Sequence, residues 1–199
     1  MSFINQSSDS FPNLNEFFET NDENRKKEII KDSVSQVIQS RILMTINKVK
    51  DKSIITFGDT GYIVYKDDKI PQDFSWQIVG VELDKKMRDN ATLIKAVLTD
   101  SNINVLTKGI EALAKTTNPV SGAVVELSKL VVGVILDIAK NKKDDQIGYY
   151  LSSFIEKLDY PNGIRDKQDV PDLTGNMFVD YSIFGYLDYA TKGVEEQKA

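Results

Sequence analysis

Apolar residues recur at helical spacing in the middle of the chain, which predicts two consecutive helices. The first covers residues 103–115 and the second residues 120–141, and Asn118-Pro119 separates them because proline cannot continue a helix. The charged side chains of the second helix fall in one narrow stripe, in which Gly133 also lies. They are Glu126, Lys129, Asp137 and Lys140. The rest of that helix is apolar or small, so we expect it to be buried around about two-thirds of its circumference.

Alternating apolar and polar residues, the pattern of a half-buried strand, occupy much of the remaining chain. Gly58-Asp59-Thr60-Gly61 is a turn signal between two short apolar runs, and we expect a second hairpin to join residues 76–83 to residues 91–99. Residues 159–174 are polar and are expected to form a loop. The predicted strands are residues 36–49, 54–57, 62–65, 76–83, 91–99, 147–155 and 176–189, and a continuing helix is the alternative for residues 147–155.

This order of elements contains no strand–helix–strand alternation, which disfavours a parallel sheet. We therefore predict an α+β fold, namely an antiparallel β-sheet or β-sandwich with an inserted helical hairpin (about 103–141) packed on it. Six residues on the apolar faces of these elements are expected to be largely buried: Trp76, Ile78, Leu130, Val131, Ile135 and Phe178.

The first 24 residues differ in composition from the rest of the chain. They hold five acidic residues and no lysine or arginine, whereas acids and bases balance in the remainder. Charge alone predicts disorder, but a short helix capped by Asn13 and Glu16 would gather apolar side chains on one face. Because exposed phenylalanines are unfavourable in water, we expect the segment to fold back on its own domain, or to mediate docking on a protein partner or self-association of the chain. The candidate partner-binding residues are Phe11, Leu14, Phe17 and Phe18.

The length of 199 residues suits one domain with an arm. We divide the chain into an acidic aromatic arm (residues 1–24), a single globular α+β domain (25–190) and a frayed C-terminal tail (191–199). A highly charged helical pattern over residues 22–33 joins the arm to the domain.

The chain contains no histidine and no cysteine. This excludes disulfides, thiolate and imidazole metal sites, and the catalytic triads and dyads that depend on these residues. Catalysis by carboxylate pairs, lysine or tyrosine is still possible. The net charge of −5 disfavours nucleic acid as a partner.

Two acidic features are weak motifs. Asp59-Thr60-Gly61 matches the signature of aspartic proteases, which need a second copy that this chain does not contain. Acidic turns could gather around calcium, but they lack the alternating ligand spacing of a calcium loop, so we expect no metal and no cofactor. These turns hold Asp67, Asp68, Asp84, Asp89, Asp144, Asp145, Asp166, Asp169 and Asp172.

The N-terminal residues lack the basic and apolar regions of a signal peptide, and no run of eighteen apolar residues occurs. We expect a cytoplasmic protein, or one exported by a route without an N-terminal signal peptide. The leading hypothesis is a non-enzymatic binding or assembly module acting through protein–protein contacts. The alternatives are a membrane-active toxin or effector that exposes its apolar helical hairpin, and a carboxylate-based hydrolase.

Overall fold

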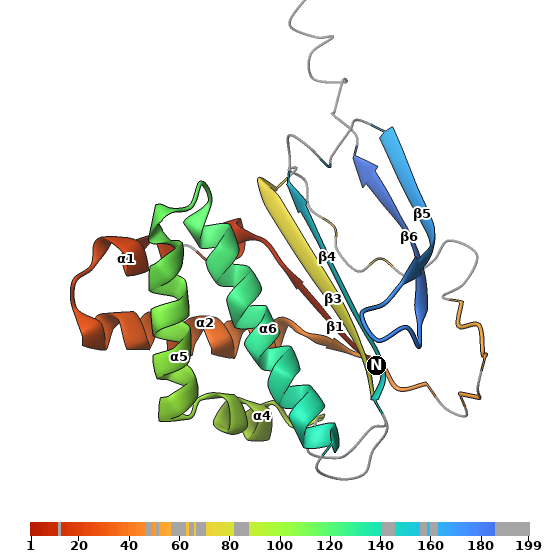
Figure 1. Ribbon diagram of the computed structural model, residues 1–199, viewed down its shortest axis with the longest axis horizontal. Helices are drawn as coiled ribbons and strands as arrows, with labels where there is room; N and C mark the ends of the chain where they lie inside the picture. The colour runs from red at the N-terminus through yellow and green to blue at the C-terminus, as the bar shows by residue number, and fades with distance from the viewer. Residues whose placement is uncertain are drawn as a thin grey trace, which may run out of the picture.

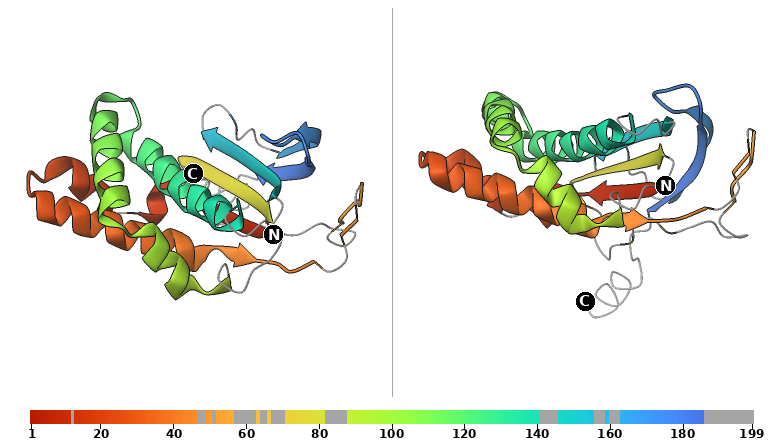
Figure 2. Two further views of the ribbon diagram at one scale, coloured as in Figure 1. Left: turned by 60° about the horizontal axis from the view of Figure 1, so that its bottom comes forward. Right: turned by 90° about the horizontal axis from the view of Figure 1, so that it is seen from below.

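The protein has three layers: helices, a four-stranded antiparallel sheet, and a two-stranded hairpin (Figure 1). Figure 2 shows the helices on one side of the sheet and the hairpin on the other. The α+β fold and the antiparallel sheet predicted from the sequence are confirmed. The computed structural model describes residues 1–11, 13–46, 49–50, 52–56, 63, 66, 71–81, 88–140, 146–155, 159 and 163–185.

The central sheet has the strand order β2-β1-β3-β4, and each neighbouring pair is antiparallel. The N-terminal strand β1 therefore lies inside the sheet, between β2 and β3. From Ser75 to Val81 every residue of β3 is buried, because this strand has neighbours on both edges and layers on both faces. The strands are β1 Ser2–Gln6, β2 Ile42–Leu43, β3 Asp73–Val81 and β4 Gln146–Ile155. The hairpin is formed by β5 Gly163–Pro171 and β6 Phe178–Gly185.

The helices begin where the sequence offers a capping group. The side chains of Asp22, Asp89 and Thr99 accept hydrogen bonds from backbone N–H groups in the first turns of α2, α4 and α5. Pro119 opens α6, a position where its missing N–H is not needed. The helices are α1 Asn13–Glu19, α2 Glu23–Ser40, α4 Asn90–Val97, α5 Asp100–Ala112 and α6 Pro119–Lys140, with short 3-10 turns η1 Ser8–Ser10 and η2 Leu113–Lys115.

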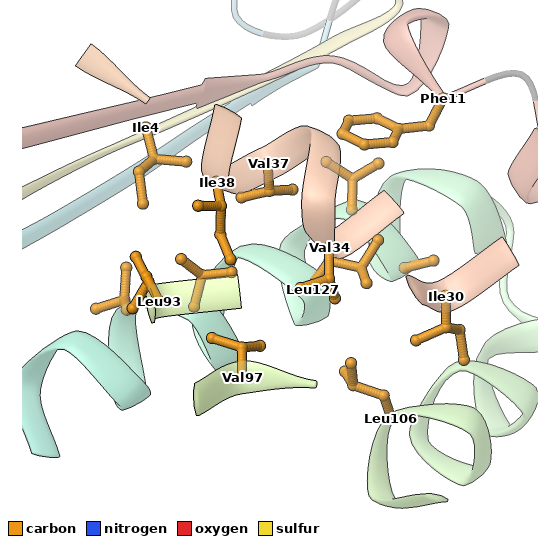
Figure 3. Packing of buried hydrophobic residues seen from close by; sticks show 14 of the residues in the cluster. Ile4, Phe11, Ile30, Val34, Val37, Ile38, Leu93, Val97, Leu106 and Leu127 are labelled. Carbon is orange, nitrogen blue, oxygen red and sulfur yellow. The ribbon is translucent and has the colours of Figure 1, made fainter. Parts of the chain in front are cut away.

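The main core lies between the helices and the sheet (Figure 3). It joins side chains from α1, α2, α4, α5 and α6 to β1 and β3. The labelled side chains in Figure 3 come from β1, α2, α4, α5 and α6, and from Phe11 just before α1, and they gather in one space between these elements. Val131 and Ile135 of α6 are buried in it, as predicted, whereas Leu130 is partly buried at its margin. The predicted helical hairpin is present as α5 and α6.

A second, aromatic core fills the space between the other face of the sheet and the hairpin. Trp76 and Ile78 are buried there, as predicted. The ring of Tyr181 on β6 lies 5.1 Å from that of Trp76 and 6.1 Å from that of Phe154, in edge-on contacts. The predicted burial of Phe178 is wrong: this side chain is 63% exposed, because it lies on the hairpin face that points away from the sheet.

The strand predicted for residues 36–49 is also wrong. Helix α2 continues to Ser40, and among the described residues 41–46 and 49 only Ile42–Leu43 pairs as a strand, with β1. Apolar residues at even positions predict a strand there, but the first part of this segment continues the three- and four-residue spacing of buried residues that begins earlier in α2. The residues that α2 buries follow that helical spacing and are Ile29, Ile30, Ser33, Val34, Val37 and Ile38.

Two further corrections concern residues 91–99 and 159–174. Residues 91–99, predicted as a strand, lie mostly in α4, where Leu93 and Val97 share one buried face at i, i+4. Much of the polar segment 159–174, predicted as a loop, forms β5, whose side chains are mostly exposed and so carry no apolar alternation. The strands predicted at 76–83, 147–155 and 176–189 correspond to β3, β4 and β6. The turn Gly58-Asp59-Thr60-Gly61 lies outside the described residues.

Candidate protein-binding groove

A shallow, open groove of about 620 Å³ runs along α6 on the side away from the core. Helix α6 forms one wall, and the corner between α4 and α5 forms the other. The lining residues are Ala96, Thr99, Asn102, Val105 and Leu106 on the α4–α5 side, and Glu126, Lys129, Leu130, Gly133, Val134, Asp137 and Ile138 on α6. The α6 residues from 126 to 138 span about 18 Å along the helix axis.

The groove follows from how α6 divides its surface. One side of the helix is buried in the core, through Ala123, Val124, Leu127, Val131, Val132, Ile135 and Ala139. The charged stripe predicted from the sequence lies on the opposite side, and its described members Glu126, Lys129 and Asp137 line the groove. The solvent-facing stripe of the sequence is therefore one wall of a concave surface.

The opposite wall is held in place by local hydrogen bonds. The Asn102 side-chain amide donates to the carbonyl oxygen of Val97 over 2.9 Å, and the Asn102 backbone N–H donates to the Thr99 hydroxyl. These bonds link the end of α4 to the start of α5 across a tight corner. Thr99 and Asn102 both line the groove. The hydrogen bonds that fix the α4–α5 corner therefore also fix the position of this wall of the groove.

The groove has an apolar floor and a polar rim. Leu106 is buried, and Leu130, Val134 and Ile138 are partly buried beside the core. Val105 stands at the edge with 66% of its surface exposed. The rim carries Glu126 and Lys129, which form an ion pair at 3.0 Å, together with Asp137.

Gly133 lies in the groove, where α6 presents only backbone. A Cβ atom placed on Gly133 would meet no other heavy atom within 4 Å. The space beside Gly133 can therefore admit a side chain from another molecule. A larger residue substituted for Gly133 would occupy the same space. The sequence pattern had already placed Gly133 within the charged stripe of α6.

The predicted partner-binding residues lie elsewhere, in α1 and just before it. Phe11, Leu14 and Phe17 are buried in the main core with exposed fractions of 2%, 0% and 1%. Phe18 is partly buried and contacts the Phe17 ring at a centroid distance of 5.4 Å. The expectation that this segment is ordered and packed is confirmed, in the form of folding back on its own domain. The partner-binding role of the four residues stays a prediction, with Phe18 the most accessible of them.

Charged contacts reinforce this fold-back arrangement. Arg25 of α2 makes a two-point ion pair with Glu16 of α1, with distances of 2.6 and 2.8 Å. The hydrogen bond from Arg25 lowers the pKa of Glu16 below its usual value. Lys26 lies over the Phe17 ring at 5.7 Å and pairs with Glu111 of α5 at 2.6 Å. At least two acidic residues of the arm therefore make contacts within the chain: Glu16 pairs with Arg25, and Asp22 caps α2.

Of the acidic turn residues considered as calcium ligands, Asp67, Asp68, Asp84, Asp144 and Asp145 lie outside the described residues, and two of the others have defined local roles. Asp89 caps α4, and Asp172 accepts hydrogen bonds from its own loop and from β4. Within the described ranges, no three carboxylates gather in an arrangement that could hold a metal ion. Nor does any described helix combine the length and apolar character needed to cross a membrane.

No protein-family model, curated protein or solved structure matches the chain.

Proposed function

We propose that the protein is a non-enzymatic binding module that receives an amphipathic helix of a partner protein in the groove between α6 and the α4–α5 corner. The observation that carries this proposal is the groove itself, with its apolar floor, polar rim and side-chain-free position at Gly133. Helix-in-groove recognition uses such surfaces, in which apolar anchors at i, i+3, i+4 and i+7 enter the floor.

The dimensions of the groove suit a helix. Its α6 wall of about 18 Å matches a partner helix of about 12 residues, or three turns. At Gly133 the absence of a side chain lets a partner approach the α6 backbone closely. The ion pair of Glu126 and Lys129 offers both signs of charge to the polar edge of such a helix.

The same geometry gives less support to the two alternatives. The groove carboxylates Glu126 and Asp137 are separated by roughly 16 Å along α6, whereas glycosidase carboxylate pairs lie about 5–10 Å apart. A membrane-active α6 would first have to leave the main core, in which Val131 and Ile135 are buried. We propose further that this binding module acts in the cytoplasm, or outside the cell after export by a route without an N-terminal signal peptide.

A pair of glycine substitutions tests the groove. Gly133→Met would place a side chain in the groove, at a position where an added Cβ has open space. Gly109→Met on α5 is the matched control, because its Cβ also has open space but Gly109 does not line the groove. Both substitutions remove a glycine from a helix interior, so neither variant should melt below the unmodified protein.

Helical peptides selected from a displayed library against the unmodified protein provide the probe. We expect their affinity, measured by fluorescence polarisation, to fall at least about tenfold for Gly133→Met, equivalent to about 1.4 kcal/mol, and to be unchanged for Gly109→Met. Peptides that bind both variants equally well, or a library that yields no binder, would contradict the groove as the binding site.

A further inference from the structure

The outer face of the β5–β6 hairpin exposes large apolar side chains on a folded sheet. Successive strand residues point to opposite faces, and Val179, Tyr181 and Ile183 of β6 point toward the central sheet. Phe178 and Phe184 therefore lie on the outer face, where they are 63% and 61% exposed.

The strand register arranges this outer face into two apolar ends. Phe184 stands opposite Ile164, which is 56% exposed, and Phe178 stands opposite Pro171. The two phenylalanines are six residues apart on β6, a separation of about 20 Å. Asp180 and Ser182 lie between them on β6, and Asp166 stands opposite Ser182 on β5.

The middle of the face is acidic. The Ser182 hydroxyl donates to Asp166 over 2.5 Å, and the Asp169 backbone N–H donates to Asp180 over 2.8 Å. Both carboxylates are exposed. Arg165 of β5 forms an ion pair with Asp159. Among the described residues, Asp166 and Asp180 have no basic partner.

The hairpin is a fixed platform for these side chains. Tyr181 packs its ring against Trp76 at 5.1 Å. At the loop end, Asp172 and Leu173 hydrogen-bond to both the N–H and the carbonyl oxygen of Tyr149 on β4. The strand that carries the exposed phenylalanines is therefore held in position. Little conformational entropy of the hairpin would be lost when a partner binds.

We propose that this outer face docks a partner protein through a segment that is both basic and apolar. Apolar side chains of the partner would cover Phe178 and Phe184, and lysine or arginine side chains would reach Asp166 and Asp180. Arginine can in addition stack on an exposed phenylalanine ring. This is a second surface, independent of the groove along α6, because it is built from the strands of the hairpin rather than from the helices, in another layer of the molecule (Figure 2).

Charge complementarity selects this occupant over two others. A second copy that docked through the same face would place Asp166 and Asp180 against identical carboxylates, which repel. An anionic lipid surface would be repelled by the same two residues. Strand addition along β5 is also disfavoured, because β5 is irregular between Lys167 and Val170 and ends in a proline.

The probe is a pair of short synthetic peptides with the same alternating leucine and phenylalanine residues, one carrying lysines and the other glutamates between them. NMR titration of the full chain should show binding of the lysine peptide, with shifts confined to residues 163–185, and at least about tenfold weaker binding of the glutamate peptide. The double variant Asp166→Asn/Asp180→Asn should weaken lysine-peptide binding about five- to tenfold and flatten its dependence on salt. The double variant Phe178→Ser/Phe184→Ser should abolish binding while keeping the melting temperature.

Leu173→Ser is the matched control, because Leu173 is 69% exposed in the loop of the hairpin and outside the strand face. It should bind the lysine peptide like the unmodified protein. The proposal is overturned if the lysine peptide does not bind, if both peptides bind alike, or if the aspartate variant keeps full affinity. It is also overturned if sedimentation velocity shows a dimer that the phenylalanine variant dissociates, or if vesicles of anionic lipid bind the unmodified protein through this face. Each result leaves the groove proposal standing, since Gly133→Met tests that surface separately.

Discussion

The Asp172 carboxylate accepts a hydrogen bond of 2.7 Å from the backbone N–H of Tyr149. The bond joins the loop of the β5–β6 hairpin to the outer edge of β4. The same carboxylate accepts bonds from the Asn176 and Met177 backbone N–H groups and from the Thr174 hydroxyl. One buried side chain therefore shapes the loop and fastens it to the sheet, in addition to the aromatic packing of the hairpin on the sheet.

We predict that Gly148→Ala loosens this attachment. A Cβ on Gly148 would lie 2.9 Å from the Asp172 Oδ2 atom and 2.9 Å from the Met177 Cβ, so the loop would have to move. The expected loss is about 1–3 kcal/mol of unfolding free energy in urea titration, the usual cost of overpacking. The near-ultraviolet circular dichroism that arises from the contact of Trp76 with Tyr181 should weaken as well.

Gly109→Ala is the control for that substitution. Gly109 is an exposed glycine inside α5, and a Cβ there meets nothing within 4 Å. Alanine should therefore stabilise the protein by about 0.5–1 kcal/mol through helix propensity. Equal effects of the two alanines would show that the loop does not press against Gly148.

The stability of the protein should depend on the protonation of Asp172. Burial alone would raise the pKa of this carboxyl group, but the hydrogen bonds from Thr174 and from backbone N–H groups outweigh burial and leave the pKa below its usual value. A lowered folded-state pKa gives stability that is fully present above the unfolded value of about 4 and is lost as the pH falls through the folded value.

Comparison with Asp172→Asn isolates this contribution. The asparagine keeps the shape but replaces one accepting oxygen by an amide, so we expect a loss of about 1–3 kcal/mol at neutral pH. The difference in unfolding free energy between the two proteins should shrink below about pH 4. A difference that stays constant down to pH 3 or so would contradict the role of the ionised carboxylate.

The sequence predicts the elements whose periodicity comes from a single buried face. Helix α6 shows this most clearly, because its buried residues and its charged stripe are both visible in the spacing of Leu127, Val131 and Asp137. The groove could be foreseen only in part. The exposed stripe is visible in the sequence, but its concave shape depends on the α4–α5 corner, and the pattern of residues 91–99 predicts a strand where α4 lies.

The hairpin could not be predicted because its two strands have different environments. β6 alternates between the aromatic core and solvent, so its strand character is clear in the sequence. β5 is mostly exposed, and the contacts that place it, its pairing with β6 and the bond of Asp172 to β4 just after its end, do not show in its apolar pattern. The burial predicted for Phe178 failed for a related reason: alternation identifies two faces but does not say which one meets the sheet.

Ile135→Ala should destabilise the protein by about 2–5 kcal/mol, because the side chain is only 1% exposed and its removal leaves a cavity in the main core. Val105→Ala is the matched control, since Val105 is 66% exposed on a neighbouring helix. It should change the unfolding free energy by no more than about 0.5 kcal/mol. Similar midpoints for both variants in urea titration would contradict the assignment of the core.

Calcium should leave the melting temperature unchanged. Asp89 and Asp172, two of the acidic residues considered as ligands, serve instead as a helix cap and a loop anchor. We expect melting curves recorded with excess calcium and with a chelator to superimpose. A calcium-dependent rise of several degrees would show that the acidic residues of this chain do form an oxygen-ligand site.

The last prediction separates the two roles considered for the N-terminal segment. Leu14 is fully buried between α1 and the core, so Leu14→Ala should lower the unfolding free energy by about 2–5 kcal/mol. Phe18 is the matched residue on the same short helix, partly buried at the surface, and Phe18→Ala should lower it by less. Urea titration measures both effects, and sedimentation velocity measures the assembly state of each variant. If Leu14→Ala leaves stability unchanged, the segment is not part of the folded domain. If Phe18→Ala keeps stability but changes assembly, the surface of α1 is a contact site, and the predicted partner-binding role of this segment rests on Phe18.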